Sequence, residues 1–177
     1  MNIWHDINEE RITKERFIAC IEISSGSHNK YELDKETGLL KLDRVLYTST
    51  HYPANYGFIP RTYALDHDPL DVLVLTNEKI VPMTLVDCKP IGVMHMTDGG
   101  DIDDKIIAIC VNDPFYNHFQ SIKDLPTHVT EEIKHFFRVY KQLEGKKTVV
   151  DSVLDDEVKA EQVIQDAIIR YKQKFEH

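Results

Sequence analysis

The order of the hydrophobic patterns along this chain is the strongest constraint on its fold. Before Pro114 the apolar residues form short runs typical of strands, separated by turns that contain Gly and Ser. The runs cover residues 17–23, 72–76, 91–96 and 106–111. After Pro114 the apolar residues recur at helical spacing. Strands followed by helices predict an α+β fold, in which helices pack on a sheet or a small barrel.

Two helices are predicted in the C-terminal part of the chain. The first begins at Pro126-Thr127 and ends at Gly145. Its apolar positions are Ile133, Phe136, Phe137, Tyr140 and Leu143. The second begins at about Asp156, because acidic residues cluster there and the positive end of a helix dipole favours them. Its apolar stripe comprises Val163, Ile164, Ala167, Ile168, Tyr171 and Phe175.

The composition suggests one soluble domain. We interpret residues 1–177 as a single domain, because no repeat or linker divides the chain and 42% hydrophobic residues suffice for one core. A net charge of −9 disfavours nonspecific binding to nucleic acid or to an anionic membrane. Cys20, Cys88 and Cys110 lack Cys-x-x-Cys spacing and are predicted to be reduced thiols. With no leader-like N-terminus and no apolar stretch of about 18 residues, a cytoplasmic location is expected.

Carboxylates are concentrated at Asp66, Asp68 and Asp71, immediately before an apolar run. Such closely spaced like charges cannot all ionise at low cost. Either one pKa rises sharply, or divalent cations hold the group together. The second alternative predicts a hydrolytic metal site.

Cationic side chains accompany carboxylates at two further places. Lys30 and Glu32 are two residues apart in a predicted strand and project from one face, and Asp103 and Lys105 repeat this spacing. The loop 98–104 adds more carboxylates. Further donors are Arg44, Tyr52, Tyr56, Tyr140 and Lys141. A polyphosphate complexed with divalent metal suits this set, because carboxylates coordinate the ions while Lys, Arg and Tyr bind phosphoryl oxygens.

The segment 66–72, Asp-His-Asp-Pro-Leu-Asp-Val, closely resembles the signature of the family I soluble inorganic pyrophosphatases. Further landmarks of that family appear in the same order: Glu22, Lys30-Tyr31-Glu32, Asp43-Arg44, Tyr52-Pro53-Ala54-Asn55-Tyr56-Gly57, Asp98, Asp103 with Lys105, and His135-Phe136-Phe137 leading to Tyr140-Lys141. The resemblance implies a small closed OB-like β-barrel with flanking C-terminal helices. It also implies pyrophosphate as the substrate and a homo-oligomer, commonly a hexamer in bacteria.

The same resemblance implies a set of metal ligands. The positions that match ligands of the activating metal are Asp66, Asp71 and Asp103, and Asp71 bridges to a second ion. Asp98 matches a ligand of the metals that arrive with substrate, and Asp103 takes part there as well. Glu32 lies beside these metals and acts through water. Oxygen-only ligands point to Mg²⁺ before zinc, and Mn²⁺ accepts the same ligands.

The remaining matches concern the reaction itself. Asp68 matches the general base that takes a proton from the attacking water. The family's groups that hold the two phosphoryl units correspond to six residues of this chain: Lys30, Arg44, Tyr56, Lys105, Tyr140 and Lys141. Glu22 and Tyr52 correspond to residues that surround these groups. Since two hard cations lower the pKa of a shared water to around 7, no covalent protein nucleophile is needed. The expected reaction is hydrolysis of pyrophosphate to two phosphates.

Two positions depart from the family pattern. His67 stands where relatives usually carry Gly, Ser, Asn or Asp, and it either points outward or tunes the choice of metal. Gly99 follows Asp98 where many bacterial relatives have Glu, so one carboxylate near the substrate metals is in doubt, and Asp101 and Asp104 are candidates to replace it. Other histidines lack metal-ligand spacing and are expected in packing or subunit contacts: His51, His95, His118, His128 and His135.

Functions of other classes fit the sequence less well. A Ca²⁺-binding EF-hand loop starting at Asp66 would need Gly and Glu where Asp71 and Asn77 stand. An OB-type nucleic-acid binder is disfavoured by the charge of −9 and by the lack of interleaved Arg and aromatic residues. Hydrolysis of nucleotides or other phosphoanhydrides is the nearest alternative, although no base-stacking or ribose-binding motif is evident.

Overall fold

Five strands form a closed barrel in the computed structural model, which describes residues 1–176. They are β1 (Phe17–Ile23), β4 (Asn55–Ile59), β5 (Leu70–Leu75), β9 (Lys105–Cys110) and β6 (Leu85–Met94), in this spatial order. A further pairing of β1 with β6 closes the barrel. β5 and β9 are parallel, and the other barrel pairs are antiparallel. The predicted α+β fold with a small closed barrel is confirmed.

The four predicted apolar runs all enter barrel strands, but strand β4 was not predicted as one of them. Its sequence is short and contains Gly57. A Cβ atom at Gly57 would lie 1.9 Å from the carbonyl oxygen of Cys20 in β1. The close approach of these two strands therefore requires glycine, and that glycine interrupts the apolar pattern from which a strand is predicted.

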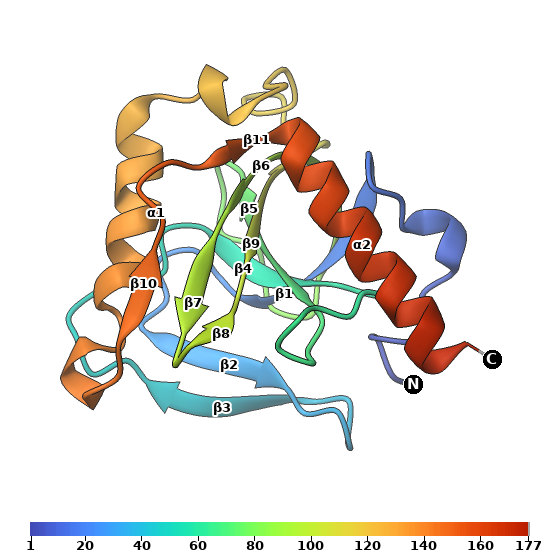
Figure 1. Ribbon diagram of the computed structural model, residues 1–177, viewed down its shortest axis with the longest axis horizontal. Helices are drawn as coiled ribbons and strands as arrows, with labels where there is room; N and C mark the ends of the chain where they lie inside the picture. The colour runs from blue at the N-terminus through green and yellow to red at the C-terminus, as the bar shows by residue number, and fades with distance from the viewer. Residues whose placement is uncertain (177) are drawn as a thin grey trace.

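Shorter elements surround the barrel (Figure 1). β2 (Asn29–Leu33) and β3 (Leu40–Val45) form a hairpin, and β7 (Met96–Asp98) pairs with both β8 (Asp101–Ile102) and β10 (Thr148–Val150). β11 (Asp155–Asp156) pairs with β6. The 3₁₀ helices are η1 (Glu9–Arg11), η2 (Ile122–Asp124) and η3 (Gln142–Glu144). The hairpins β2–β3 and β7–β8 lie at the same end of the barrel, between the two long helices.

Those helices are α1 (Thr127–Val139) and α2 (Glu157–Phe175), on either side of the barrel. Both begin where predicted, and the Asp156 side chain caps α2 by accepting the amide of Val158. α1, however, ends at Val139 rather than Gly145, because η3 follows it. Leu143 lies in this tighter helix and is 70% exposed, so its assignment to the apolar face was wrong. None of the described helices is long and apolar enough to cross a membrane.

The barrel strands are apolar on both faces. Along β5, Leu73 packs in one cluster with Phe137 of α1, whereas Val72 packs in another with Ile164 of α2. Such strands leave little room for charged side chains except at their ends. The ends of β5 and β9 carry the charged residues of the site.

The three cysteines are free thiols, as predicted. Cys20 and Cys88 are buried, and Cys110 is partly buried. Burial raises the pKa of the Cys20 thiol to about 12. This thiol is therefore protonated and unreactive at neutral pH.

Candidate active site

A cavity of about 300 Å³ lies where β5 and β9 begin. Strands β2, β4 and β7 also contribute to its wall, together with the segment that follows α1. The wall contains every predicted site residue except Arg44: Lys30, Glu32, Tyr56, Asp66, Asp68, Asp71, Asp98, Asp103, Lys105, Tyr140 and Lys141. Residues that are far apart in sequence thus meet in one place.

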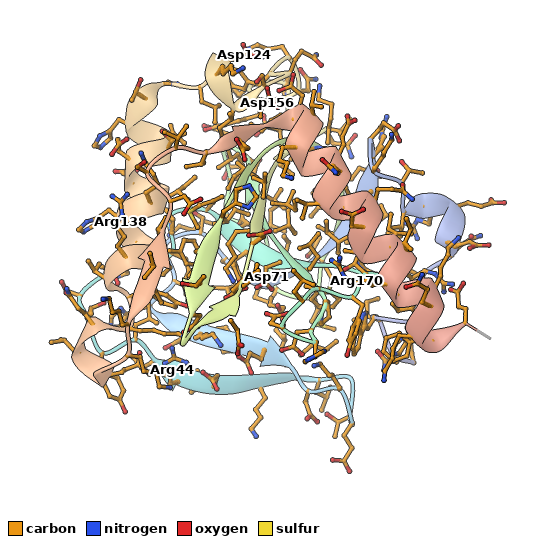
Figure 2. The ribbon with its side chains drawn as sticks, in the orientation of Figure 1. Arg44, Asp71, Asp124, Arg138, Asp156 and Arg170 are labelled. Atoms are coloured by element: carbon orange, nitrogen blue, oxygen red, sulfur yellow. The ribbon has the colours of Figure 1, made fainter. Side chains whose placement is uncertain are left out.

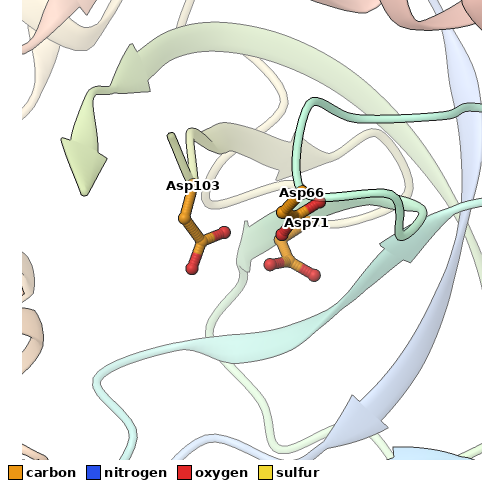
Figure 3. A group of neighbouring side chains, drawn as sticks. All are labelled: Asp66, Asp71 and Asp103. Atoms are coloured by element: carbon orange, nitrogen blue, oxygen red, sulfur yellow. The ribbon is translucent and has the colours of Figure 1, made fainter. Parts of the chain in front are cut away.

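Three carboxylates converge in this cavity (Figure 3). Asp66 precedes β5, Asp71 belongs to β5, and Asp103 precedes β9. One oxygen atom from each lies within 4.8 Å of the other two. Within residues 1–176, no other group of His, Cys, Asp or Glu side chains meets this spacing. A cluster made only of oxygen ligands fits a hard divalent cation such as Mg²⁺ or Mn²⁺.

Lys105 is the buried cation of the site, with 2% of its surface exposed. Its Nζ donates to Asp71 Oδ2 at 2.6 Å, to Asp103 Oδ1 at 2.8 Å and to the Tyr56 hydroxyl at 3.0 Å. Burial acts to lower the pKa of Lys105, but the neighbouring acidic groups outweigh burial and raise this pKa well above its ordinary value. Lys105 is therefore a permanent positive charge between two carboxylates.

The carboxylates differ in how easily they ionise. Burial, reinforced by the charge of Asp103, raises the pKa of Asp71 to about 6. Burial and Asp103 also raise the pKa of Asp66. Burial opposes ionisation of Asp103 too, but Lys105 outweighs it and lowers the Asp103 pKa. One lysine thus compensates the cluster only in part, and a bound divalent cation would supply the missing positive charge.

Outside this cluster, three acidic side chains of the wall form ion pairs with three basic ones. The ion pairs join Lys30 to Glu32, Lys141 to Asp98, and Lys35 to Asp68. Each pair combines a metal-ligand type with a phosphate-binding type. A metal-complexed polyphosphate would offer every one of these groups a partner of opposite charge.

Arg44 is the predicted site residue that does not line the cavity. It lies opposite Lys30 in the β2–β3 hairpin and forms ion pairs with Asp43 and with Glu144 of η3. Its Nε is 2.8 Å from Glu144 Oε1. Figure 2 shows Arg44 near the end of β3, whereas Asp71 lies near the centre of the molecule.

Three tyrosines form a buried wall beside the charged groups. The ring of Tyr52 packs at a tilt, 5.5 Å from the ring of Tyr56 and 4.7 Å from that of Phe136, and Phe136 stacks on Tyr140 at 5.2 Å. Burial raises the pKa of all three phenols. They are therefore neutral hydrogen-bond donors, held rigidly by aromatic packing.

Glu22 of β1 is 8% exposed and also faces the cavity. Its Oε2 accepts the backbone N–H of Leu33 at 2.7 Å. Burial raises the pKa of Glu22 to about 8, because this single hydrogen bond does not offset desolvation.

Replacing Glu22 with Gln is expected to remove a loss of stability that develops as the pH rises from 4.5 to about 8. The folded-state pKa of about 8 exceeds the ordinary 4.5, so folding takes up a proton and stability falls as the pH rises through this window. The amide keeps the bond to Leu33 but cannot ionise. In urea unfolding with chelator, the variant should gain up to about 1.4 kcal/mol per pH unit relative to the wild type. Glu10→Gln, at an exposed position, is the control; parallel stability curves for Glu22→Gln and the wild type would contradict this expectation.

The two departures from the family signature have structural explanations. His67 has a φ of 70°, a conformation that Gly, Asn and Asp adopt most easily, which explains the usual residues at this position. Its Nδ1 lies 3.0 Å from the Tyr63 hydroxyl, so the ring contacts Tyr63 and does not line the cavity. Asp101 is exposed and Asp104 contacts His95, and neither lines the cavity, so the prediction that one of them replaces a carboxylate at Gly99 was wrong.

The sequence did not identify three residues that contact the site. Lys35 lines the cavity, pairs with Asp68 and lies 5.0 Å from the ring of Trp4, which also lines it. Glu144 holds Arg44. A lysine in a hairpin turn and a glutamate after a helix resemble solvated surface residues, so no sequence signal separates them from such residues.

Comparisons with known proteins agree with this geometry. A family model described as inorganic pyrophosphatase matches residues 19–172. The soluble inorganic pyrophosphatase 2 of Chlamydomonas reinhardtii is 49% identical over 173 residues, which cover 97% of this chain and 89% of that protein. The soluble inorganic pyrophosphatase PPA1 of Solanum tuberosum is 52% identical over 151 residues, or 85% and 72% of the two chains. The inorganic pyrophosphatase structure from Thermus thermophilus aligns with a TM-score of 0.92 at 38% identity, covering 97% of this chain and 99% of that one, and the OB-like barrel is shared. The chain therefore belongs to the inorganic pyrophosphatase family.

Proposed function

We propose that this protein is a hydrolase that converts inorganic pyrophosphate and water into two phosphates with the help of Mg²⁺. Membership of the inorganic pyrophosphatase family supports the substrate. The observation that carries the proposal is the cluster of Asp66, Asp71 and Asp103, surrounded by basic side chains in one cavity. A ligand that combines divalent metal with phosphoryl oxygens would contact both the acidic and the basic side chains of this cavity.

The acidic side chains would hold the metal ions. Asp66, Asp71 and Asp103 are proposed as ligands of the activating ion, and Asp98 and Glu32 as groups that bind ions arriving with the substrate. Their oxygen donors fit Mg²⁺, with Mn²⁺ as a substitute. When bound, divalent ions would lower the pKa of the attacking water and stabilise the negative charge of the phosphoryl group.

The other residues bind the substrate and move the proton. Asp68 is proposed to accept the proton of the attacking water; its side chain is 57% exposed and within the cavity wall. Lys30, Lys105 and Lys141 neutralise phosphoryl oxygens, and Tyr56 and Tyr140 donate hydrogen bonds to them. Arg44 joins this set by exchanging its contacts with Asp43 and Glu144 for a phosphoryl oxygen. Positioning and charge then provide most of the acceleration.

Further properties are proposed from the sequence and from the family. We infer one domain over residues 1–177, a cytoplasmic location, and no nucleic-acid or membrane partner. The family resemblance favours a homo-oligomer, a hexamer in particular. Sedimentation of the purified protein measures this last property directly.

Phosphate release from pyrophosphate tests the proposed function. We expect rapid release with Mg²⁺, measurable release with Mn²⁺, none with chelator, and little from ATP offered in parallel. Faster release from ATP than from pyrophosphate would instead favour a general phosphoanhydride hydrolase. No release under any metal would reject the assignment and favour a binding module.

A further inference from the structure

His95 lies between two carboxylates that belong to different parts of the fold. It occupies the corner between β6 and β7, with a side chain that is 24% exposed. Its Nδ1 is 3.0 Å from Asp104 Oδ1, in the turn before β9, and its Nε2 is 2.8 Å from Asp155 Oδ2, in β11. Neither carboxylate forms an ion pair with another basic side chain within residues 1–176.

This geometry favours a protonated ring. A neutral imidazole carries a single N–H, so one nitrogen would present its lone pair to a carboxylate oxygen at hydrogen-bond distance. An imidazolium donates from both nitrogens. In agreement, burial acts to lower the pKa of His95, but Asp104 and Asp155 outweigh burial and raise this pKa above 6.5.

The groups around His95 leave it no other charged partner. The connector between β10 and β11 contributes a backbone contact, since the Asp151 amide donates to the His95 carbonyl at 3.0 Å. Asp156, next to Asp155, pairs instead with Lys123 of η2 at 3.2 Å. On β9, the ammonium of Lys105 is bound to Asp71 and Asp103.

The contact with Asp104 bears on the metal site, because the preceding residue, Asp103, is one of the three clustered carboxylates. The preceding turn, residues 99–102, is exposed throughout, and a Cβ at Gly99 or Gly100 would meet no atom within 4 Å. Packing therefore does little to hold this turn. The β7–β8 pairing, the Asp103 amide that donates to the Met96 carbonyl at 2.9 Å, and the bond from Lys105 to the Asp103 carboxylate also hold this turn. The His95–Asp104 contact adds a link from the end of the turn, through His95, to Asp155 of β11.

We propose that His95 is a positioning residue for the metal site: by binding Asp104 and Asp155 together, it fixes the turn that presents Asp103 to Asp66 and Asp71. The inference rests on the metal site of the proposed function. It predicts that Mg²⁺ binds more tightly when His95 is protonated. The sign is informative, because the positive charge of the ring would by itself repel Mg²⁺ and weaken binding.

The first test is Mg²⁺ binding to the full chain by calorimetry, without pyrophosphate. At pH 7, His95→Gln should raise the Mg²⁺ dissociation constant about tenfold, the size expected when a partner that orients a metal ligand is lost. Asp155→Asn, which leaves the turn itself unchanged, should raise the constant in the same direction. His128→Gln is the matched control, since His128 is 83% exposed and its partner Glu132 lies on the same helix. Unchanged or tighter binding in His95→Gln would overturn the proposal.

The second test follows the ring itself. Nitrogen-detected spectra of the imidazole should show both nitrogens of His95 protonated at pH 7, and Asp155→Asn should lower the pH at which the ring loses its proton. In the wild type, the Mg²⁺ dissociation constant should rise as the pH is raised through the point at which His95 loses its proton. In His95→Gln this rise should be absent. A neutral His95 ring at pH 7 would contradict the proposal.

These measurements separate the inference from the proposed function. A chain that binds Mg²⁺ with the expected dependence on His95 but does not hydrolyse pyrophosphate would reject the function and support the positioning role. A wild-type chain that does not bind Mg²⁺ would overturn both. In the active enzyme, the positioning role predicts a higher Mg²⁺ requirement for His95→Gln and a kcat close to wild type at saturating Mg²⁺.

Discussion

Replacing Asp68 with Asn is expected to lower kcat by about 100- to 10,000-fold, the range over which a positioned general base contributes to a reaction. The amide has nearly the same shape but cannot accept a proton. Because the Asp68 side chain is 57% exposed and its ion pair is with the partly exposed Lys35, the fold should be unaffected. Steady-state phosphate release at saturating Mg²⁺, together with thermal unfolding, measures both effects.

The matched control for Asp68→Asn is Asp101→Asn, because Asp101 is an exposed aspartate of β8 that does not line the cavity. This control should retain wild-type kcat. A wild-type kcat in Asp68→Asn, with unchanged Mg²⁺ dependence, would show that Asp68 is not the base. A rise in the Mg²⁺ requirement with unchanged kcat would assign Asp68 to metal binding instead.

Replacing Asp71 with Asn should have two effects of opposite sign. Mg²⁺ affinity should fall by about 100-fold or more, since even outer partners of metal ligands account for about 10- to 100-fold. In chelator at pH 7.5, the same variant should be more stable than the wild type by about 1 to 3 kcal/mol. The reason is that the Asp71 pKa rises from 3.8 to about 6 on folding, so its ionised form opposes folding despite Lys105. Calorimetry with Mg²⁺ and urea unfolding in chelator measure the two quantities.

Asp87→Asn provides the control for Asp71→Asn, because Asp87 is a partly buried aspartate of a barrel strand outside the cavity. It should leave Mg²⁺ affinity unchanged. Unchanged Mg²⁺ affinity in Asp71→Asn would remove Asp71 from the metal ligands. A large loss of stability in chelator would mean that the Lys105–Asp71 pair is a net contributor to folding.

The sequence predicted most of the site because its residues carry a local signature and a fixed order along the chain. The family signature implies that Asp66, Asp71 and Asp103 are metal ligands, and the structure brings their oxygens together. The class of fold followed from the change in periodicity near Pro114. The end of α1 could not be predicted from this periodicity, because Leu143 has an apolar side chain at helical spacing although it lies in a 3₁₀ helix.

Contacts that depend on tertiary structure were beyond the sequence. His95, Asp104 and Asp155 carry no common spacing, and β11, only two residues long, brings Asp155 beside β6. Similarly, Lys35 reaches Asp68 across 33 residues of sequence, through the path of the β2–β3 hairpin. Such pairs arise from chain topology, and periodicity or composition reports only on neighbours along one element.

The parallel pairing of β5 with β9 has a consequence for how the chain refolds. Asp71 and Lys105 are direct partners in this pairing although 34 residues separate them in sequence. A slip of one residue would turn one of the two side chains to the opposite face, into an apolar cluster. Parallel pairing of distant segments is also slow, because the loop between them must close first. During refolding, Mg²⁺ affinity should thus return late and in a single step. The time of its return would report when β5 and β9 pair in the native register.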